Sequence, residues 1–269
     1  MCRMLGVVCN DEDLLPCAIN EVSQALRCDE DAKHDGIGVG YYSHDEPLLK
    51  KRPSAKIAEI DYPELVEGVS SSTLLIHIRK ATVGAWKEAN THPFRFRKWL
   101  FAHVGHLPGL DQNKEDIVKQ LPPFLSRNIK GDTDSEIAFH MFLDILFREG
   151  KLNDFDLNIE TLDSYLKETV TKINEKHPGP QLPELSIIIT NGQIMSAVCQ
   201  GIAMHYSLRE GILECPQCDE TDQQKHLHGR FKGVMLGADM SDPGHQWREV
   251  ADSSLLHVSQ ELELKVQQL

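Results

Sequence analysis

The Asn191-Gly192 pair between two short apolar runs is the feature that most limits how this chain can fold. The runs are Leu185–Thr190 and Ile194–Cys199, and each has the length and β-branched content of a strand. Asn-Gly readily adopts the left-handed backbone of a two-residue hairpin loop, so the two runs are predicted to pair antiparallel. Antiparallel pairing argues against a parallel, doubly wound sheet.

Further strands and three helices are predicted from the spacing of apolar residues. The helices are expected over 14–26, from Thr133 through Leu146, and over 160–173, where apolar residues recur at helical spacing. The additional strands are Met4–Cys9, Ile37–Tyr42, Thr73–Ile78, Trp99–Val104 and Lys232–Leu236. Helices in blocks between antiparallel strands favour a layered α+β architecture. Because the sequence contains no repeat or convincing linker, we expect residues 1–269 to form a single domain.

Charge and cysteine content narrow the classes of partner. The formal net charge of −13 works against binding to nucleic acid or to an anionic membrane. No run approaches the roughly 18 apolar residues of a membrane span, and acidic residues 11–13 interrupt the first apolar run, so we also expect no secretory signal. Seven cysteines, an odd number, indicate reduced thiols and a cytoplasmic protein.

Cys2 is the strongest candidate for a catalytic residue. Removal of Met1 would make Cys2 the chain terminus, with its thiol within reach of its own α-amino group. That amine titrates near about 7.7 to 8.0, so it can take a proton from the nucleophile near neutral pH. One residue would then supply both nucleophile and base, although a cysteine also occurs at position two by chance.

Six short motifs, the first of which begins with Cys2, occur one after another in the first half of the chain. They are Cys2-Arg-Met-Leu-Gly6, His34-Asp-Gly-Ile-Gly-Val-Gly-Tyr-Tyr42, His77-Ile-Arg-Lys-Ala-Thr-Val-Gly84, Asn90-Thr-His-Pro-Phe94, Phe101-Ala-His-Val-Gly105 and Thr133-Asp-Ser-Glu136. Together they resemble the class II glutamine amidotransferases. The similarity is greatest to the stand-alone branch that includes the γ-glutamyl hydrolase of ergothioneine synthesis and the amidotransferase-like subunit of glutathione breakdown.

The resemblance implies an N-terminal-nucleophile (Ntn) hydrolase fold, a four-layer αββα sandwich of two mainly antiparallel sheets. Arg79 matches the arginine that binds the substrate carboxylate, a role suited to its planar, bidentate fork. Asp134 matches the acceptor of the substrate ammonium, and Thr82 and His92 match further pocket residues. Gly105 matches the glycine whose backbone N–H helps to bind the oxyanion. Considered alone, Arg79 and Asp134 would be read as a surface ion pair and a helix cap.

Val104 is the one clear departure from the family pattern. The family usually has His-Asn-Gly in this motif, and the asparagine donates a second hydrogen bond to the oxyanion. Here the motif is His103-Val104-Gly105, and valine cannot donate. Another donor is therefore needed for full activity, and His103, His106 and Asn90 are the candidates nearest in sequence.

We therefore expect an amidohydrolase that cleaves a small-molecule γ-glutamyl substrate through Cys2, without a cofactor. Free hydrolysis is expected rather than channelled transfer of ammonia. Two alternatives stay open: a non-catalytic γ-glutamyl-binding protein, and an ammonia-donating subunit of a larger complex. The sequence also leaves open a homodimer or a partner subunit.

Two further side-chain groups are assigned no catalytic role. Cys215-Pro-Gln-Cys218, with His226 and His228 downstream, contains zinc-ligand types but matches no standard spacing. We favour a plain hairpin loop there over a structural zinc site and predict no metal. Glu136 and His140 lie one helical turn apart and are expected on a solvated face.

Overall fold

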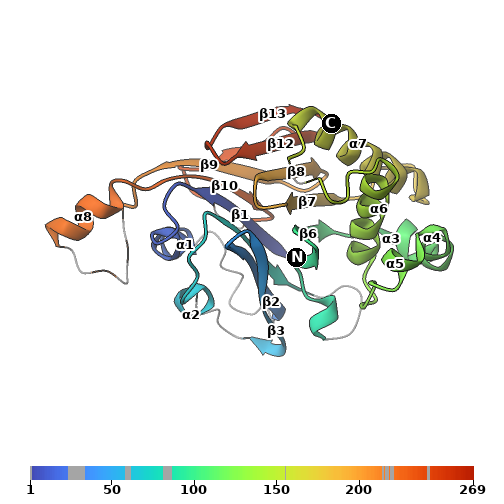
Figure 1. Ribbon diagram of the computed structural model, residues 1–269, viewed down its shortest axis with the longest axis horizontal. Coiled ribbons are helices and arrows are strands. Elements are labelled where there is room, and N and C mark those ends of the chain that lie inside the picture. The colour runs from blue at the N-terminus through green and yellow to red at the C-terminus, as the bar shows by residue number, and fades with distance from the viewer. Residues whose placement is uncertain are drawn as a thin grey trace.

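The strands of this protein form two sheets. The structure is a computed structural model that describes residues 2–23, 34–57, 62–80, 87–154, 156–213, 215, 218, 221–240 and 243–269. Within these residues one sheet has the order β11-β9-β10-β1-β4-β2-β3, and the other has the order β13-β12-β8-β7-β6-β5 (Figure 1). All strand pairs in both sheets are antiparallel.

The predicted strands and helices are all present. The first sheet contains β1 (Arg3–Cys9), β2 (His34–Ser43), β3 (Glu46–Ile57), β4 (Thr73–Arg79), β9 (Met204–Glu210), β10 (Lys232–Ala238) and β11 (Arg248–Glu249). The second contains β5 (Phe94–Phe96), β6 (Trp99–Gly105), β7 (Leu185–Thr190), β8 (Ile194–Gln200), β12 (Ser254–Ser259) and β13 (Leu264–Gln268). The helices are α1 (Leu15–Val22), α2 (Tyr62–Val66), α3 (Pro108–Gln112), α4 (Lys114–Gln120), α5 (Pro123–Ser126), α6 (Asp134–Arg148), α7 (Ile159–Lys176) and α8 (Asp222–His228). Helix α1 was predicted to reach residue 26, and positions 24–26 lie outside the described residues.

The hairpin predicted at Asn191-Gly192 joins β7 to β8. Gly192 has φ of 90°, and Asn191 Oδ1 accepts hydrogen bonds from the backbone of Gln193 and Ile194, both at 3.0 Å. The asparagine thus closes the turn with its own side chain while glycine supplies the left-handed backbone. The strands pair from Leu185↔Gln200 to Thr190↔Met195, as a tight antiparallel hairpin requires.

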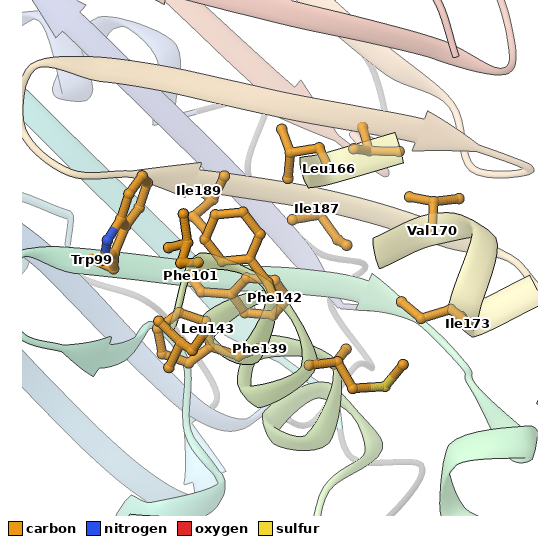
Figure 2. Packing of buried hydrophobic residues seen from close by; sticks show 14 of the residues in the cluster. Trp99, Phe101, Phe139, Phe142, Leu143, Leu166, Val170, Ile173, Ile187 and Ile189 are labelled. Carbon is orange, nitrogen blue, oxygen red and sulfur yellow. The ribbon is translucent and has the colours of Figure 1, made fainter. Parts of the chain in front are cut away.

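Three buried apolar clusters define four layers. One lies between the sheets and includes Met4 and Leu75 from the first sheet and Leu100 and Val104 from the second. A second lies between the first sheet and helices α1 and α2. The third lies between the second sheet and helices α6 and α7, and Figure 2 shows its aromatic and aliphatic side chains: Trp99, Phe101, Phe139, Phe142, Leu143, Leu166, Val170, Ile173, Ile187 and Ile189. The predicted αββα sandwich of antiparallel sheets is therefore confirmed.

One hydrogen bond between the sheets fixes where their strand ends meet. His77 of β4 donates from Nε2 to the backbone carbonyl of His103 in β6, at 3.1 Å. Two residues further along each strand lie Arg79 and Gly105, the last residues of β4 and β6. Because β1 runs antiparallel to β4, its first residues lie at the same edge, with Arg3 opposite Ile78. The sandwich therefore gathers the start of β1 and the ends of β4 and β6 at one edge.

Candidate active site

Cys2 lies at this edge, half-buried, next to the residue that follows β4. Its thiol donates a hydrogen bond to the carbonyl of Lys80 at 3.2 Å, and its sulfur accepts one from the Lys80 backbone N–H at 3.3 Å. The side chain packs against the cluster between the sheets, to which Val104 belongs. Burial raises the pKa of the Cys2 thiol, and the N–H of Lys80 opposes that effect by stabilising the thiolate. A thiol held neutral in this way needs a base before it can attack.

Arg79 is buried next to Cys2 in the strand register, with 4% of its surface exposed. Leu75, His77 and Arg79 are two residues apart along β4, so their side chains lie on the same face of the strand. Because Leu75 belongs to the cluster between the sheets, His77 and Arg79 also project into that space. The positive charge of Arg79 also acts on Cys2 and lowers the pKa of its thiol, an effect smaller than that of burial. A guanidinium beside a thiol provides a cation near the position of a bound substrate.

The segment Asn90–Pro93 crosses the glycine-rich strand β2. A Cβ on Gly38 would lie 2.0 Å from the carbonyl oxygen of His92, so only glycine permits this approach. The glycines of β2 thus make room for the segment that carries His92. The glycine-rich segment of β2 is therefore a closely packed strand.

His92 is linked to His77 and His103 in a buried, uncharged network. His92 Nδ1 lies 3.1 Å from His77 Nε2. Because Nε2 of His77 carries the hydrogen that it donates to the His103 carbonyl, His92 Nδ1 is an acceptor and His92 Nε2 bears a hydrogen. No hydrogen-bond partner for that Nε2 occurs within the described part of the chain. Burial lowers the pKa of His77 to about 3 and that of His92 well below its usual value, so both rings are neutral near pH 7.

Asp134 is held at the start of α6 by backbone and side-chain donors. Its Oδ2 accepts from the Leu107 N–H at 2.7 Å, and its Oδ1 accepts from the Ser135 N–H at 2.8 Å and the Ser135 hydroxyl at 3.2 Å. The helix is capped instead by Thr133, whose hydroxyl accepts from the Glu136 N–H at 3.3 Å. Asp134 is therefore not the cap. Its carboxylate is 5% exposed and connects α6 to the loop that follows β6.

Gly105 has a backbone that other residues rarely adopt. Its φ is 138°, and a Cβ there would lie 2.1 Å from the carbonyl oxygen of Glu184. Glycine is thus required at the end of β6 by both backbone conformation and space. The neighbouring Val104 is 1% exposed and faces the cluster between the sheets, on the side where Cys2 packs. The side chain at position 104 projects into the same cluster that Cys2 contacts, and valine provides no hydrogen-bond donor there.

Of the three alternative oxyanion donors, His103 directs its hydrogen elsewhere, and Asn90 is held in place through its side-chain oxygen. Asn90 is buried, and its Oδ1 accepts from the Asp132 N–H at 2.8 Å. His103 Nδ1 lies 2.9 Å from the Ser135 hydroxyl, whose hydrogen goes to Asp134, so Nδ1 bears the hydrogen and His103 Nε2 is an acceptor. His106 remains: its half-exposed ring has Nδ1 3.6 Å from Asp134 Oδ2.

Thr82 lies outside the described residues, so its predicted place in the pocket rests on sequence alone. The prediction of a solvated face for Glu136 and His140 was wrong, because they are only 4% and 3% exposed. Glu136 accepts hydrogen bonds from the backbone of Lys130 at 2.8 Å and Gly131 at 2.6 Å, which compensates its burial. The spacing of residues along the helix could not reveal that the backbone of Lys130 and Gly131 folds back onto Glu136.

The chain is similar in sequence to known amidotransferases. The family described as "Glutamine amidotransferases class-II" matches residues 1–236. The probable glutamine amidotransferase DUG3 of Saccharomyces cerevisiae is 28% identical over 204 residues, which are 67% of this chain and 57% of that protein. A putative glutamine amidotransferase of Haemophilus influenzae is 26% identical over 216 residues, 78% of this chain and 66% of the relative. The matches thus span 57% to 66% of these two relatives.

Solved structures agree in fold. A glutamine aminotransferase class-II domain protein from Silicibacter pomeroyi superposes with a TM-score of 0.61 at 17% identity, covering 99% of both chains. A predicted glutamine amidotransferase from Pseudomonas aeruginosa also gives a TM-score of 0.61, at 19% identity, covering 98% of this chain and 100% of that one. At these identities the similarity shows the fold alone.

Proposed function

Because this chain belongs to the class II glutamine amidotransferase family, we propose that it is an amidohydrolase that cleaves the γ-glutamyl amide of glutamine or of a γ-glutamyl compound. The observation that carries the proposal is the position of the Cys2 thiol, bonded to Lys80 beside the buried Arg79. Cys2 and Arg79 lie at the edge of the sandwich where β6 ends at Gly105, a glycine with a positive φ.

The proposed reaction begins after removal of Met1 exposes the α-amine of Cys2. This amine takes the proton of the thiol, and the sulfur attacks the γ-carbonyl to form a tetrahedral oxyanion. The backbone N–H of Gly105 stabilises the oxyanion. The α-ammonium returns the proton to the departing amine as the C–N bond breaks, which leaves a thioester between the Cys2 sulfur and the γ-glutamyl carbonyl. Water, deprotonated by the same amine, then attacks the thioester and releases glutamate.

Recognition of the glutamyl group is assigned to two opposite charges and two polar residues. Arg79 binds the α-carboxylate in a bidentate contact, and the carboxylate of Asp134 accepts the α-ammonium. His92 is assigned to the pocket because its Nε2–H is a buried donor with no partner among the described residues. Thr82 is assigned to the pocket from the sequence motif alone.

The missing donor at Val104 favours a second candidate, a γ-glutamyl-binding protein with little or no turnover. Loss of one oxyanion donor typically lowers kcat by about 10² to 10³, which leaves a slow enzyme rather than an inert one. We therefore retain slow hydrolysis as the main proposal. A third candidate, an ammonia-donating subunit, follows from the names of the relatives rather than from this site.

The test is glutamate release from a panel containing glutamine, γ-glutamyl amino acids and γ-glutamyl peptides such as glutathione. Wild-type protein should release glutamate from at least one compound, and Cys2→Ala and Cys2→Ser should fall to background. Cys9→Ser is the matched control, since Cys9 lies on the same strand but faces the helix-covered side of the sheet. Turnover that persists in Cys2→Ala would refute the mechanism. Tight binding without turnover by wild-type protein would favour the binding protein.

A further inference from the structure

Four side chains that can ligate a metal converge where α1 meets the connection between β9 and β10. They are Cys17 of α1, Cys215 and Cys218 before α8, and His228 at the end of α8. One ligand atom from each lies within 4.8 Å of all the others. The closest recorded approach is 3.6 Å, between the sulfurs of Cys17 and Cys218, which are 201 positions apart in the sequence.

These separations are close to those of a tetrahedral zinc site. Zinc binds thiolate sulfur at about 2.3 Å and imidazole nitrogen at about 2.0 to 2.1 Å. In a tetrahedron these bond lengths put two sulfurs about 3.8 Å apart and a sulfur and a nitrogen about 3.6 Å apart. Small shifts of the side chains would therefore suffice to bring all four atoms to bonding distance.

The contacts of Gln224 indicate that Cys218 Sγ and His228 Nε2 point toward a common position. Its Nε2 lies 3.3 Å from Cys218 Sγ and 3.0 Å from His228 Nε2. An amide nitrogen is a donor, so both the sulfur and the imidazole nitrogen direct lone pairs toward it. A cation requires the same orientation, and it would take the place of this amide group.

Among the described residues of the connection between β9 and β10, Ile212 and Phe231 at its two ends are buried in the apolar cluster under α1, and few apolar contacts hold the residues between them. Leu213 is 75% exposed, and within the described part of α8 only His228 is buried. The polar contact between Arg209 and Glu21 anchors the end of β9 to α1, and Glu21 also accepts from the Leu213 N–H at 2.8 Å. Cys17 precedes Glu21 by one helical turn, so the same face of α1 meets the cysteines. A metal ion bound by the four side chains would attach the connection to α1 in addition to these contacts.

We propose that Cys17, Cys215, Cys218 and His228 bind a structural zinc ion. Three thiolates and one imidazole form a closed ligand set with the softness that zinc prefers, and they leave no position open for a substrate. From sequence we predicted no metal because Cys215 and Cys218 had no partners at a standard spacing. The fold supplies the missing ligand from α1.

The site lies far from the proposed catalytic centre. Cys9 at the end of β1 pairs with Gly233, next to the pair Lys232↔Glu210 that bounds the connection. Cys2 is at the other end of β1, about 20 Å away for a strand of this length. Loss of zinc should therefore loosen the connection and α1 rather than remove a catalytic group.

The test is the metal content of tag-free protein, purified under reducing conditions without chelator. Wild-type protein should contain close to one zinc per chain, and Cys17→Ser, Cys218→Ser and His228→Ala should lose most of it. His226→Ala and Gln224→Ala are matched controls on the same helix that should keep the metal. His226 is exposed and lies outside the cluster, and Gln224 only donates hydrogen bonds to it.

A second measurement uses wild-type protein alone, in case the cysteine variants fail to fold. Zinc removed by a chelator should be replaced stoichiometrically, and cobalt in its place should give the visible absorption of tetrahedral thiolate coordination. Re-addition of zinc should raise the Tm. Folded protein that holds no zinc or cobalt after reconstitution would overturn the proposal, as would retention of zinc in all three ligand variants. A disulfide between Cys17 and Cys218 that persists under reducing conditions in the presence of zinc would also overturn it.

Discussion

Replacing Val104 with asparagine should make this protein less stable and more active. Val104 is 1% exposed between the two sheets, in the cluster against which Cys2 packs. The substitution puts an amide into the cluster that Cys2 contacts. We therefore expect the amide to donate a hydrogen bond to the oxyanion, as Gly105 is proposed to do.

The substitution should lower the free energy of unfolding and also lower the activation free energy of the reaction, by different amounts. Fully burying a valine side chain contributes about 1.5 to 3 kcal/mol, and an unsatisfied buried polar group costs about 1 to 3 kcal/mol more. The free energy of unfolding should therefore fall by roughly 2.5 to 6 kcal/mol. One oxyanion donor contributes about 2.7 to 4 kcal/mol to the transition state. Since the amide must still find good geometry, kcat should rise by at least about tenfold with little change in KM.

Steady-state kinetics on glutamine and on glutathione, combined with chemical denaturation, measures both effects. Val104→Ala is the matched control, because it also loses buried apolar surface but introduces no donor. It should be destabilised without a gain in kcat. If Val104→Asn is folded and its kcat does not exceed that of Val104→Ala on either compound, position 104 does not face the oxyanion and the reasoning is wrong.

Three other predictions concern the rest of the site. Gly105→Ala should lower kcat by about 10² to 10³ by displacing the oxyanion N–H. Gly150→Ala, at a glycine that also has a positive φ (67°) but has nothing near its Cβ, should leave kcat unchanged. Equal kcat values in the two variants would remove Gly105 from the mechanism. Arg79→Lys and Asp134→Asn should each raise KM for γ-glutamyl substrates more than they lower kcat, and normal KM in both would mean that the pocket lies elsewhere. Burial lowers the pKa of His77 to about 3, so the folded protein should lose stability as pH falls below about 6.5, where the unfolded histidine gains a proton. Denaturation curves of His77→Gln should show a slope shallower by up to about 1.4 kcal/mol per pH unit between pH 6 and pH 4, and an unchanged slope would contradict the buried, neutral assignment.

The parts of the fold that follow from sequence are those with a strong local signal. Asn191-Gly192 specified its hairpin, and the apolar period specified α6 and α7. The strands that sequence analysis did not predict lie at or next to a sheet edge, and among them β12 is apolar and buried whereas others are polar. In β13, at an edge, four of the five residues are exposed, so no apolar alternation marks it as a strand.

The site could be predicted to a similar extent. Motif order singled out Cys2, Arg79 and Asp134 as candidates, but it gave no sign that His103 Nε2 is an acceptor. That assignment depends on the hydrogen bonds of Ser135, which exist only in the folded chain. Cys17 could not be connected to Cys218 for the same reason, since sequence spacing carries no information about contacts between distant elements.

The central claim is that Cys2 is a processed, N-terminal nucleophile, and mass spectrometry tests it most directly. Protein from its native host would be incubated with a glutamine analogue that carries a chloroketone in place of the γ-amide, then analysed intact and after digestion. The account predicts a chain that lacks Met1 and carries one adduct, on Cys2, whose formation is slowed by excess glutamate. Retention of Met1, or labelling of another cysteine while Cys2 stays unmodified, would contradict it.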